Sequence, residues 1–269
     1  MRFRRAFTIV ELLTVIAVIA ILLGLLIPSM NMARNAANVA KQKVQIASID
    51  KALLLFRDDY GDYPPSAYTP TGGEYYCGAQ KLAEALFGLD LLGFNPDTLW
   101  DAGMAAYISD TLADRKPRYL ELDSVDVVNV SVYYDDPLGQ LVPDTYVICD
   151  VFGHRKLDIG TKQENVGMPV LYFKADPSKF VFSERQMNDS VYNLWDNLFL
   201  LMAQMQYEED NDTGREHPIV TNFYRAAYKL YDTRITTKDW PHRPDSYILI
   251  SAGLDGEFGT DDDITNFGK

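Results

Sequence analysis

Acidic side chains gather near the C-terminus of the chain, in the stretch SAGLDGEFGTDDDITNF. Five lie within nine residues, with no basic residue among them: Asp255, Glu257, Asp261, Asp262 and Asp263. Calcium binds six to eight oxygen atoms from carboxylates and carbonyls, and the glycines of this stretch allow tight backbone turns. The spacing is not that of an EF-hand. Composition alone leaves two readings open, a calcium site and a solvated acidic turn screened by salt.

A second carboxylate stands in a different setting, inside an apolar stretch near the N-terminus. Residues 7–27 are almost wholly apolar but include Glu11, and a charge in hydrocarbon costs a few kcal/mol. As a helix, this stretch rises about 31 Å, which matches a hydrocarbon core of about 30 Å. The preceding residues are basic, with Arg2, Arg4 and Arg5, which favours a cytoplasmic N-terminus and a C-terminal bulk across the membrane. Glu11 is then either a snorkelling carboxylate or a group that a partner neutralises.

The residues around Glu11 carry a family resemblance. A short basic leader, a small residue, Phe, and then Thr-Ile-Val-Glu-Leu-Leu before an aliphatic run resemble the prepilin signal of type IV pilins and type II secretion pseudopilins, over residues 4–34. The resemblance implies that a prepilin peptidase cleaves the bond between Ala6 and Phe7 and methylates the new amine. One residue departs from the family pattern, since Ala6 stands where Gly is usual.

The same resemblance implies an assembly role for Glu11. Subunits would leave the bacterial inner membrane sideways, with the help of an inner-membrane assembly platform, and join a helical filament of pilin-like subunits. The ammonium of Phe7 in one subunit would pair with Glu11 of its neighbour, and each charge would offset the cost of burying the other. Glu11 would therefore set the register of assembly.

The acidic C-terminal stretch resembles the calcium loop of the major type II secretion pseudopilin. The similarity lies in a strand that ends in Ser-small-Gly-x-Asp-Gly and is followed by Gly and Asp-Asp-x-Ile. It implies calcium as the cofactor, with side-chain ligands from Asp255 and from one or two of Asp261, Asp262 and Asp263. A further acidic stretch at 208–216 lacks these features and is predicted to be a solvated loop.

Hydrophobic periodicity predicts that the N-terminal helix continues past Pro28. One face is apolar, with Val39, Ile46, Ile49, Leu53 and Phe56. The opposite face is polar, with Lys41, Lys43, Gln45, Asp50 and Lys51. The Gly and Pro residues of the stretch DDYGDYPPS are expected to end the helix.

The order of elements predicts an α+β fold with an antiparallel sheet, pilin-like with a large insertion. Further helices are expected at 78–94, 191–205 and 222–231, and strands at 125–134, 146–152, 169–176 and 246–251. Four segments are predicted: a leader at 1–6, the transmembrane and assembly half of the helix at 7–28, its amphipathic half at 29–60, and an extracytoplasmic globular domain at 61–269 with an insertion at about 95–238.

Composition and motifs argue against catalysis and nucleic-acid binding. The formal charge of −13 repels nucleic acid. No P-loop or nucleophile elbow occurs. The three histidines are dispersed, and the prolines beside His217 and His242 predict surface turns for both. Cys77 and Cys149 are too far apart in sequence to be paired on that basis.

We therefore expect a non-enzymatic pseudopilin-like subunit that contacts the membrane, the peptidase and other subunits. Two alternatives stay open. One is a minor pilin or adhesin whose enlarged domain binds a target at a filament tip, as the long middle segment allows. The other is a plain N-anchored periplasmic protein.

Overall fold

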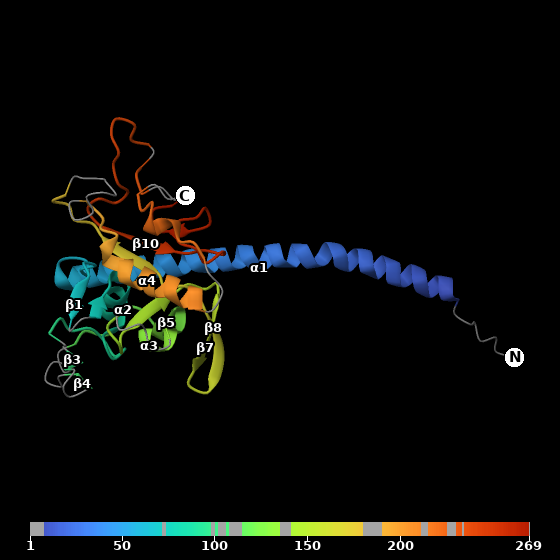
Figure 1. The fold of residues 1–269 in the computed structure, drawn as a ribbon, viewed down its shortest axis with the longest axis horizontal. Coiled ribbons are helices and arrows are strands. Elements are labelled where there is room, and N and C mark those ends of the chain that lie inside the picture. Colours follow the sequence, from blue (N-terminus) through green and yellow to red (C-terminus); the bar gives the residue numbers. More distant parts are fainter. Residues whose placement is uncertain are drawn as a thin grey trace. The chain divides into compact units, whose positions relative to one another are not determined.

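The chain has a long apolar N-terminal helix and a domain of helices and small antiparallel sheets, which confirms the predicted α+β class (Figure 1). This computed structural model describes residues 8–71, 74–97, 100–101, 106–107, 115–134, 141–179, 190–210, 215–224, 230–232 and 234–268. Two compact units are present, Met1–Ala40 and Lys41–Lys269. The predicted processing residues Ala6 and Phe7 lie outside the described residues.

Helix α1 runs without interruption over Ile9–Tyr60 and contains Pro28. It lies near the N-terminus and is long and apolar enough to span a membrane. Its end follows from Gly61, which adopts a φ of +82° and donates its N–H to the Arg57 carbonyl at 2.7 Å. A glycine in this left-handed conformation is a common way to close a helix.

The later turns of α1 belong to the globular unit and bury one face, as predicted. The buried apolar residues include Ile46, Ile49, Leu53 and Phe56. The prediction that Gln45 is on the polar outer face was wrong, because Gln45 is only 4% exposed. Its side-chain amide donates to the Cys149 carbonyl at 2.7 Å, and this hydrogen bond makes its burial tolerable.

Two antiparallel groups of strands form the centre of the globular unit. The first has the order β11-β10-β9, and the second pairs β5 with β6. Their bounds are β5 Asp126–Asn129, β6 Tyr146–Cys149, β9 Leu171–Lys174, β10 Tyr247–Ser251 and β11 Ile264–Thr265. Backbone hydrogen bonds of 2.8 Å from Val170 to Ile148 and from Asp150 to Met168 join β6 to the residues before β9. Strands β9 and β10 are almost completely buried.

Helices α2 (Gly78–Phe87) and α4 (Trp195–Asp210) pack on this centre. Helix α2 is shorter than the predicted helix at 78–94, because Gly88 takes a φ of +83° and its N–H donates to the Glu84 carbonyl at 2.6 Å. Helix α4 begins and ends later than the predicted 191–205. The smaller elements are β1 Thr69–Thr71, β2 Glu74–Tyr76, β3 Trp100–Asp101, β4 Ala106–Tyr107, η2 Leu122–Ser124 and η4 Pro218–Val220.

The strand predicted at 125–134 is only half a strand. After β5 the chain turns into a short helix, α3, at Val130–Tyr133. The Asn129 side chain accepts the Ser131 N–H at 2.8 Å and so caps the new helix. The alternating valines indicated an extended strand, but this local hydrogen bond favours a helical turn.

A hairpin that the sequence analysis missed follows β6. Strands β7 (Arg155–Ile159) and β8 (Lys162–Val166) pair over their full length. They are joined by two residues that include Gly160 at a φ of +65°, which suits a tight hairpin turn. The hairpin projects from the rest of the globular unit (Figure 1). Of the helix predicted at 222–231, the central residues 225–229 lie outside the described part of the chain.

Asp150 is a fully buried carboxyl at the point where β6, the residues before β9, and β10 meet. Its Oδ1 accepts the backbone N–H groups of Phe152 and Met168 at 3.2 and 3.1 Å, and its Oδ2 accepts the Ser251 hydroxyl at 2.9 Å. Burial raises the pKa of Asp150 to about 7, although these hydrogen bonds oppose the shift. The folded state therefore holds this proton more tightly than the unfolded chain does.

A raised carboxyl pKa makes folding stability fall as pH rises from about 4, where the unfolded chain loses the proton, to about 7, where the folded chain loses it. Asp150→Asn keeps the two hydrogen bonds that Oδ1 accepts, replaces the one from Ser251 by a hydrogen bond that the Asn amide donates to the Ser251 oxygen, and removes this titration. Relative to the original chain, the variant should gain up to about 4 kcal/mol in unfolding free energy between pH 4 and pH 8, at about 1.4 kcal/mol per pKa unit. Urea unfolding of the full chain in detergent measures this, with the exposed Asp158→Asn as control. An unchanged pH dependence contradicts the role given to Asp150.

Candidate functional site

Glu11 lies in the first turn of α1 and closes a capping box with Thr8. The Glu11 Oε2 atom accepts the Thr8 backbone N–H at 2.9 Å and the Thr8 hydroxyl at 2.8 Å. In return, the Thr8 hydroxyl oxygen accepts the Glu11 N–H at 3.2 Å. This reciprocal arrangement satisfies two of the free N–H groups at a helix start. The sequence signal was present as Thr-x-x-Glu, but it was not considered beside the family resemblance.

The capping box leaves part of the Glu11 carboxylate available. Both hydrogen bonds from Thr8 go to Oε2, and Oε1 accepts none from the described residues. Glu11 is exposed, and so are the apolar side chains that follow it on α1. The carboxylate can therefore cap its own helix through Oε2 and still bind a positively charged group of another molecule through Oε1.

The acidic C-terminal loop connects β10 with β11 and brings together two of the four predicted calcium ligands. The Asp262 carboxylate accepts the Asp255 N–H at 2.9 Å through Oδ2 and the Thr260 hydroxyl at 2.6 Å through Oδ1. Asp255 Oδ1 accepts the Glu257 N–H at 2.8 Å. Gly253 is needed here, since a Cβ at this position would come within 2.4 Å of the Asp262 carbonyl.

The carboxyls of Asp255 and Asp262 interact directly and titrate in opposite directions. Burial raises the pKa of Asp255, and the carboxyl of Asp262 adds to this shift. Burial also acts on Asp262, but hydrogen bonds from Thr260 and from the Asp255 backbone outweigh it and lower the pKa of Asp262. A raised pKa on one carboxyl and a lowered pKa on the other are the expected result when two carboxyls lie side by side.

The other two predicted ligands lie elsewhere. Asp263 is buried and its Oδ2 accepts the Gly259 N–H at 2.8 Å, whereas Asp261 is exposed. In the part of the chain that the structure describes, no group of three or more His, Cys, Asp or Glu side chains is placed to hold a metal ion. The donor set for a cation thus consists of the Asp255 and Asp262 carboxylates, together with whatever backbone oxygens and water complete it.

Two histidines hold this loop, one at its start and one at its middle. His217 Nδ1 accepts the Phe258 N–H at 3.0 Å, so its Nε2 carries the proton and donates to Glu208 at 3.1 Å. His154 Nε2 lies 2.9 Å from the Gly253 carbonyl. The loop is therefore connected to α4 through His217 and to the start of the β7–β8 hairpin through His154.

These contacts correct two predictions. His217 is not in a surface turn, because it is only 4% exposed and packs against Phe258. Glu208 is not part of a solvated loop, because it is 3% exposed and lies in the last turn of α4. Burial alone raises the pKa of Glu208, but hydrogen bonds from His217 and Gln204 hold it below the usual value. Residues 211–214 of that stretch lie outside the described part.

Neither correction was visible in the sequence. Glu208 and His217 are close in number, but only the fold places His217 between Glu208 and Phe258 of the loop. Cys77 and Cys149 are both buried free thiols, and burial raises the pKa of Cys77 to about 12.

Comparison with known proteins adds no relative. The chain matches no protein-family model, no curated protein and no solved structure. The interpretation of both sites therefore depends on the residues and contacts described above.

Replacing His217 should release the acidic loop. His217→Ala leaves the Phe258 N–H and the Glu208 carboxylate buried without their partner, which should lower the unfolding free energy by about 2–4 kcal/mol. Hydrogen exchange of the Phe258 amide should accelerate at the same time. His242→Ala, which removes a ring stacked on Phe267, is the control. Unchanged protection of Phe258 in His217→Ala contradicts the proposed anchoring.

Proposed function

We propose that the chain is a structural subunit of a type II secretion or type IV pilus-like filament, a pseudopilin. The observation that carries this proposal is the position of Glu11, which lies four residues after Phe7 at the start of an apolar helix long enough to cross a membrane. The basic leader favours a single-pass anchor in the bacterial inner membrane with its N-terminus in the cytoplasm and the globular unit in the periplasm.

Processing follows from the same residues. A prepilin peptidase would cleave between Ala6 and Phe7 and methylate the Phe7 amine. Thr8 keeps its backbone N–H after this cleavage, so the capping box that holds Glu11 survives in the mature chain. The new ammonium would then be created within a few residues of a carboxylate that the helix already orients.

Assembly would use the free side of Glu11 and the apolar surface behind it. The Oε1 atom is available to the Phe7 ammonium of a neighbouring subunit. The exposed apolar side chains of α1 include Ile9, Leu12, Ile16, Ile19 and Leu23, and they can exchange lipid contacts for contacts with other helices. The role is mechanical and needs no catalytic group.

Variants at Glu11 and Thr8 separate the assembly role from the capping role. Gln at this position still accepts the Thr8 N–H, so Glu11→Gln should keep the helix start and membrane insertion but lose the charge pair. We expect its incorporation into sheared filaments to fall at least tenfold. Thr8→Ala removes about 1 kcal/mol of capping but keeps the charge, and should retain most incorporation.

Intact mass of the membrane-bound chain tests the earlier step in the same preparations. A mature chain that starts at N-methylated Phe7 in both variants shows that processing is intact and that the Glu11→Gln defect lies in assembly. Normal incorporation of Glu11→Gln contradicts the role of the charge. A chain that still begins at Met1 beside an active peptidase contradicts the whole proposal.

The acidic loop is proposed to bind calcium, with Asp255 and Asp262 as the side-chain ligands. The donor chemistry supports this, because a divalent cation would offset the repulsion between two adjacent carboxylates and would bind to their oxygens. Backbone oxygens of the glycine-rich turn would complete the coordination. Asp263 already accepts the Gly259 N–H and would act by shaping the loop.

Calcium should therefore stabilise the full chain by about 2.7 kcal/mol at a hundredfold excess over its dissociation constant. Asp255→Asn should abolish this gain, yet be at least as stable as the original chain without calcium, because it removes a like-charge contact. Thermal unfolding with calcium, magnesium or a chelator measures the difference, and Asp261→Asn is the control. A calcium response that survives in Asp255→Asn argues against this site.

A further inference from the structure

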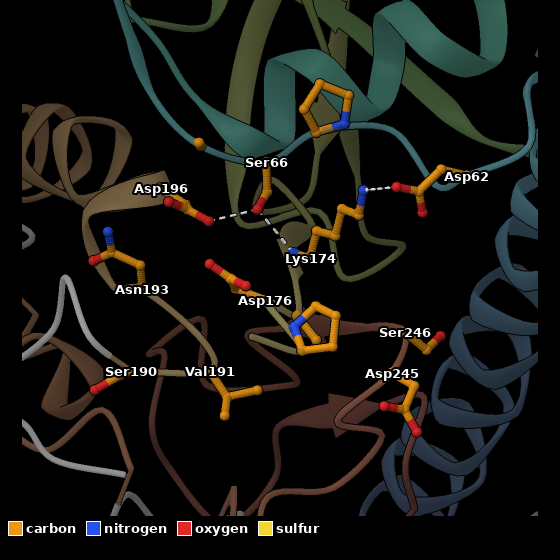
Figure 2. A pocket seen from close by; sticks show the side chains of 14 residues that line it. Asp62, Ser66, Lys174, Asp176, Ser190, Val191, Asn193, Asp196, Asp245 and Ser246 are labelled. Atoms are coloured by element: carbon orange, nitrogen blue, oxygen red, sulfur yellow. Dashed lines mark hydrogen bonds and ion pairs between the residues drawn. The ribbon is translucent and has the colours of Figure 1, made fainter. Parts of the chain in front are cut away.

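A cavity of about 370 Å³ lies in the globular unit, away from the acidic loop. Its walls come from the segment after α1, the end of β9, the segment that leads into α4, and the residues just before β10. Figure 2 shows side chains from all four segments around one hollow. This volume is within the range of small-ligand sites.

The cavity carries an excess of negative charge. Four carboxyls and one ammonium line it: Asp62, Asp176, Asp196, Asp245 and Lys174. Lys174 is already engaged, since its Nζ lies 2.5 Å from the Asp62 carboxylate (Figure 2). No basic group of the described residues lies within ion-pair distance of the other three. The cavity is thus short of positive charge.

Asp196 is the buried carboxyl of this cavity. It lies in the first turn of α4, is only 4% exposed, and uses Oδ2 to accept the Ser66 hydroxyl at 2.5 Å. Ser66 is held in place, because its side-chain oxygen accepts the backbone N–H of Lys174 at 2.8 Å. The second oxygen, Oδ1, accepts no hydrogen bond from the described residues. Asp196 lines the cavity, so this oxygen can accept a hydrogen bond from a donor that enters it.

Burial raises the pKa of Asp196 to about 7, while Ser66 and the nearby Lys81 oppose the shift. The charged form of this group is therefore disfavoured in the empty cavity and would be favoured by a cation. This agrees with the geometry.

The arrangement selects an extended organic cation over a metal ion. Among the described side chains, the carboxylates are spread around the walls and no three of them converge as metal ligands. Between them the cavity has short polar groups at Ser190 and Ser246 and apolar surface at Pro65, Pro177 and Val191. Such walls suit a charged head on an alkyl chain, whose methylene groups can lie on apolar surface.

We propose that this cavity binds a primary alkylammonium group, supplied by a lysine side chain of another protein chain or by a free polyamine. The ammonium takes Oδ1 of Asp196 as its buried acceptor, and Asp176 and Asp245 contribute at the mouth. The alkyl chain lies along the prolines and Val191. This site is independent of the filament role and of the acidic loop.

Binding of two probes to the full chain in detergent tests the proposal by calorimetry. Nα-acetyl-lysine amide, with its side-chain ammonium free, represents a protein lysine, and spermidine represents a free polyamine. Nα-acetyl-norleucine amide is the uncharged control. We expect at least one amine to bind and the norleucine compound not to bind. Tighter binding of the lysine compound identifies a protein partner, and tighter binding of spermidine identifies a polyamine.

Variants locate the binding. Asp196→Asn keeps an acceptor for Ser66 and should weaken amine binding at least tenfold. Asp176→Asn, at an exposed position, gives a second variant that leaves the core untouched and should also weaken binding. Asp158→Asn, on the β7–β8 hairpin, is the matched control for loss of one negative charge. Equal binding by Asp196→Asn, Asp176→Asn and Asp158→Asn, or no binding of either amine to the original chain, overturns the proposal.

Discussion

One helix, α1, is apolar on every face in its first part and amphipathic in its second part. The rest of the structure depends on this constraint. Between residues 9 and 30, the apolar side chains of α1 are exposed on every face. Water does not favour such a surface, so only hydrocarbon or another chain can cover it. Over residues 41–60 the same helix buries one face only, and its outer face is largely polar. The change occurs without a break in the helix, so one element links an exposed apolar segment with a folded core.

Buried polar groups on α1 determine where the helix contacts the sheet. Gln45 donates to the carbonyl of Cys149, and Gln42 accepts the Val151 N–H at 3.1 Å. Both partners are backbone groups at the end of β6, where strand pairing stops. Apolar contacts alone tolerate small shifts of one element along another, whereas these hydrogen bonds are satisfied in one register only. Asp150 acts between the same strands, which concentrates the polar part of the core in one place.

Local periodicity was a good guide to the elements and a poor guide to their ends. The apolar face of α1 was predictable from its repeating pattern of apolar residues, and strands β9 and β10 were predictable from their short continuous apolar runs. The ends of α2 and β5 were not, because a glycine φ value and one Asn129 hydrogen bond determined them. The β7–β8 hairpin was missed because its strands are mostly polar, and only the Gly-Thr turn indicated it.

The functional residues, too, were only partly predictable from the sequence. Glu11 and the acidic loop were found because charges in unusual settings can be recognised in a sequence. Thr8, the partner of Glu11, is local and was overlooked. The histidines that hold the acidic loop were not found, because they depend on contacts between distant segments. His217 and Glu208 appeared as surface residues, yet both are buried against the loop. Ser66 and Asp196 are 130 residues apart, and only the fold brings them into one cavity.

The contacts at the acidic loop define what a bound cation would change. His154 fixes the start of the loop and His217 fixes its middle, each to a separate element, and the Arg215 Nη1 lies so close to Gly256 that a Cβ there would come within 2.6 Å of it. The course of the backbone is therefore set by the protein itself. These contacts do not remove the repulsion between the carboxyls of Asp255 and Asp262, which adds to the effect of burial in raising the pKa of Asp255. A cation would offset that repulsion, so it should change the stability and charge of the loop and leave the path of its backbone unchanged.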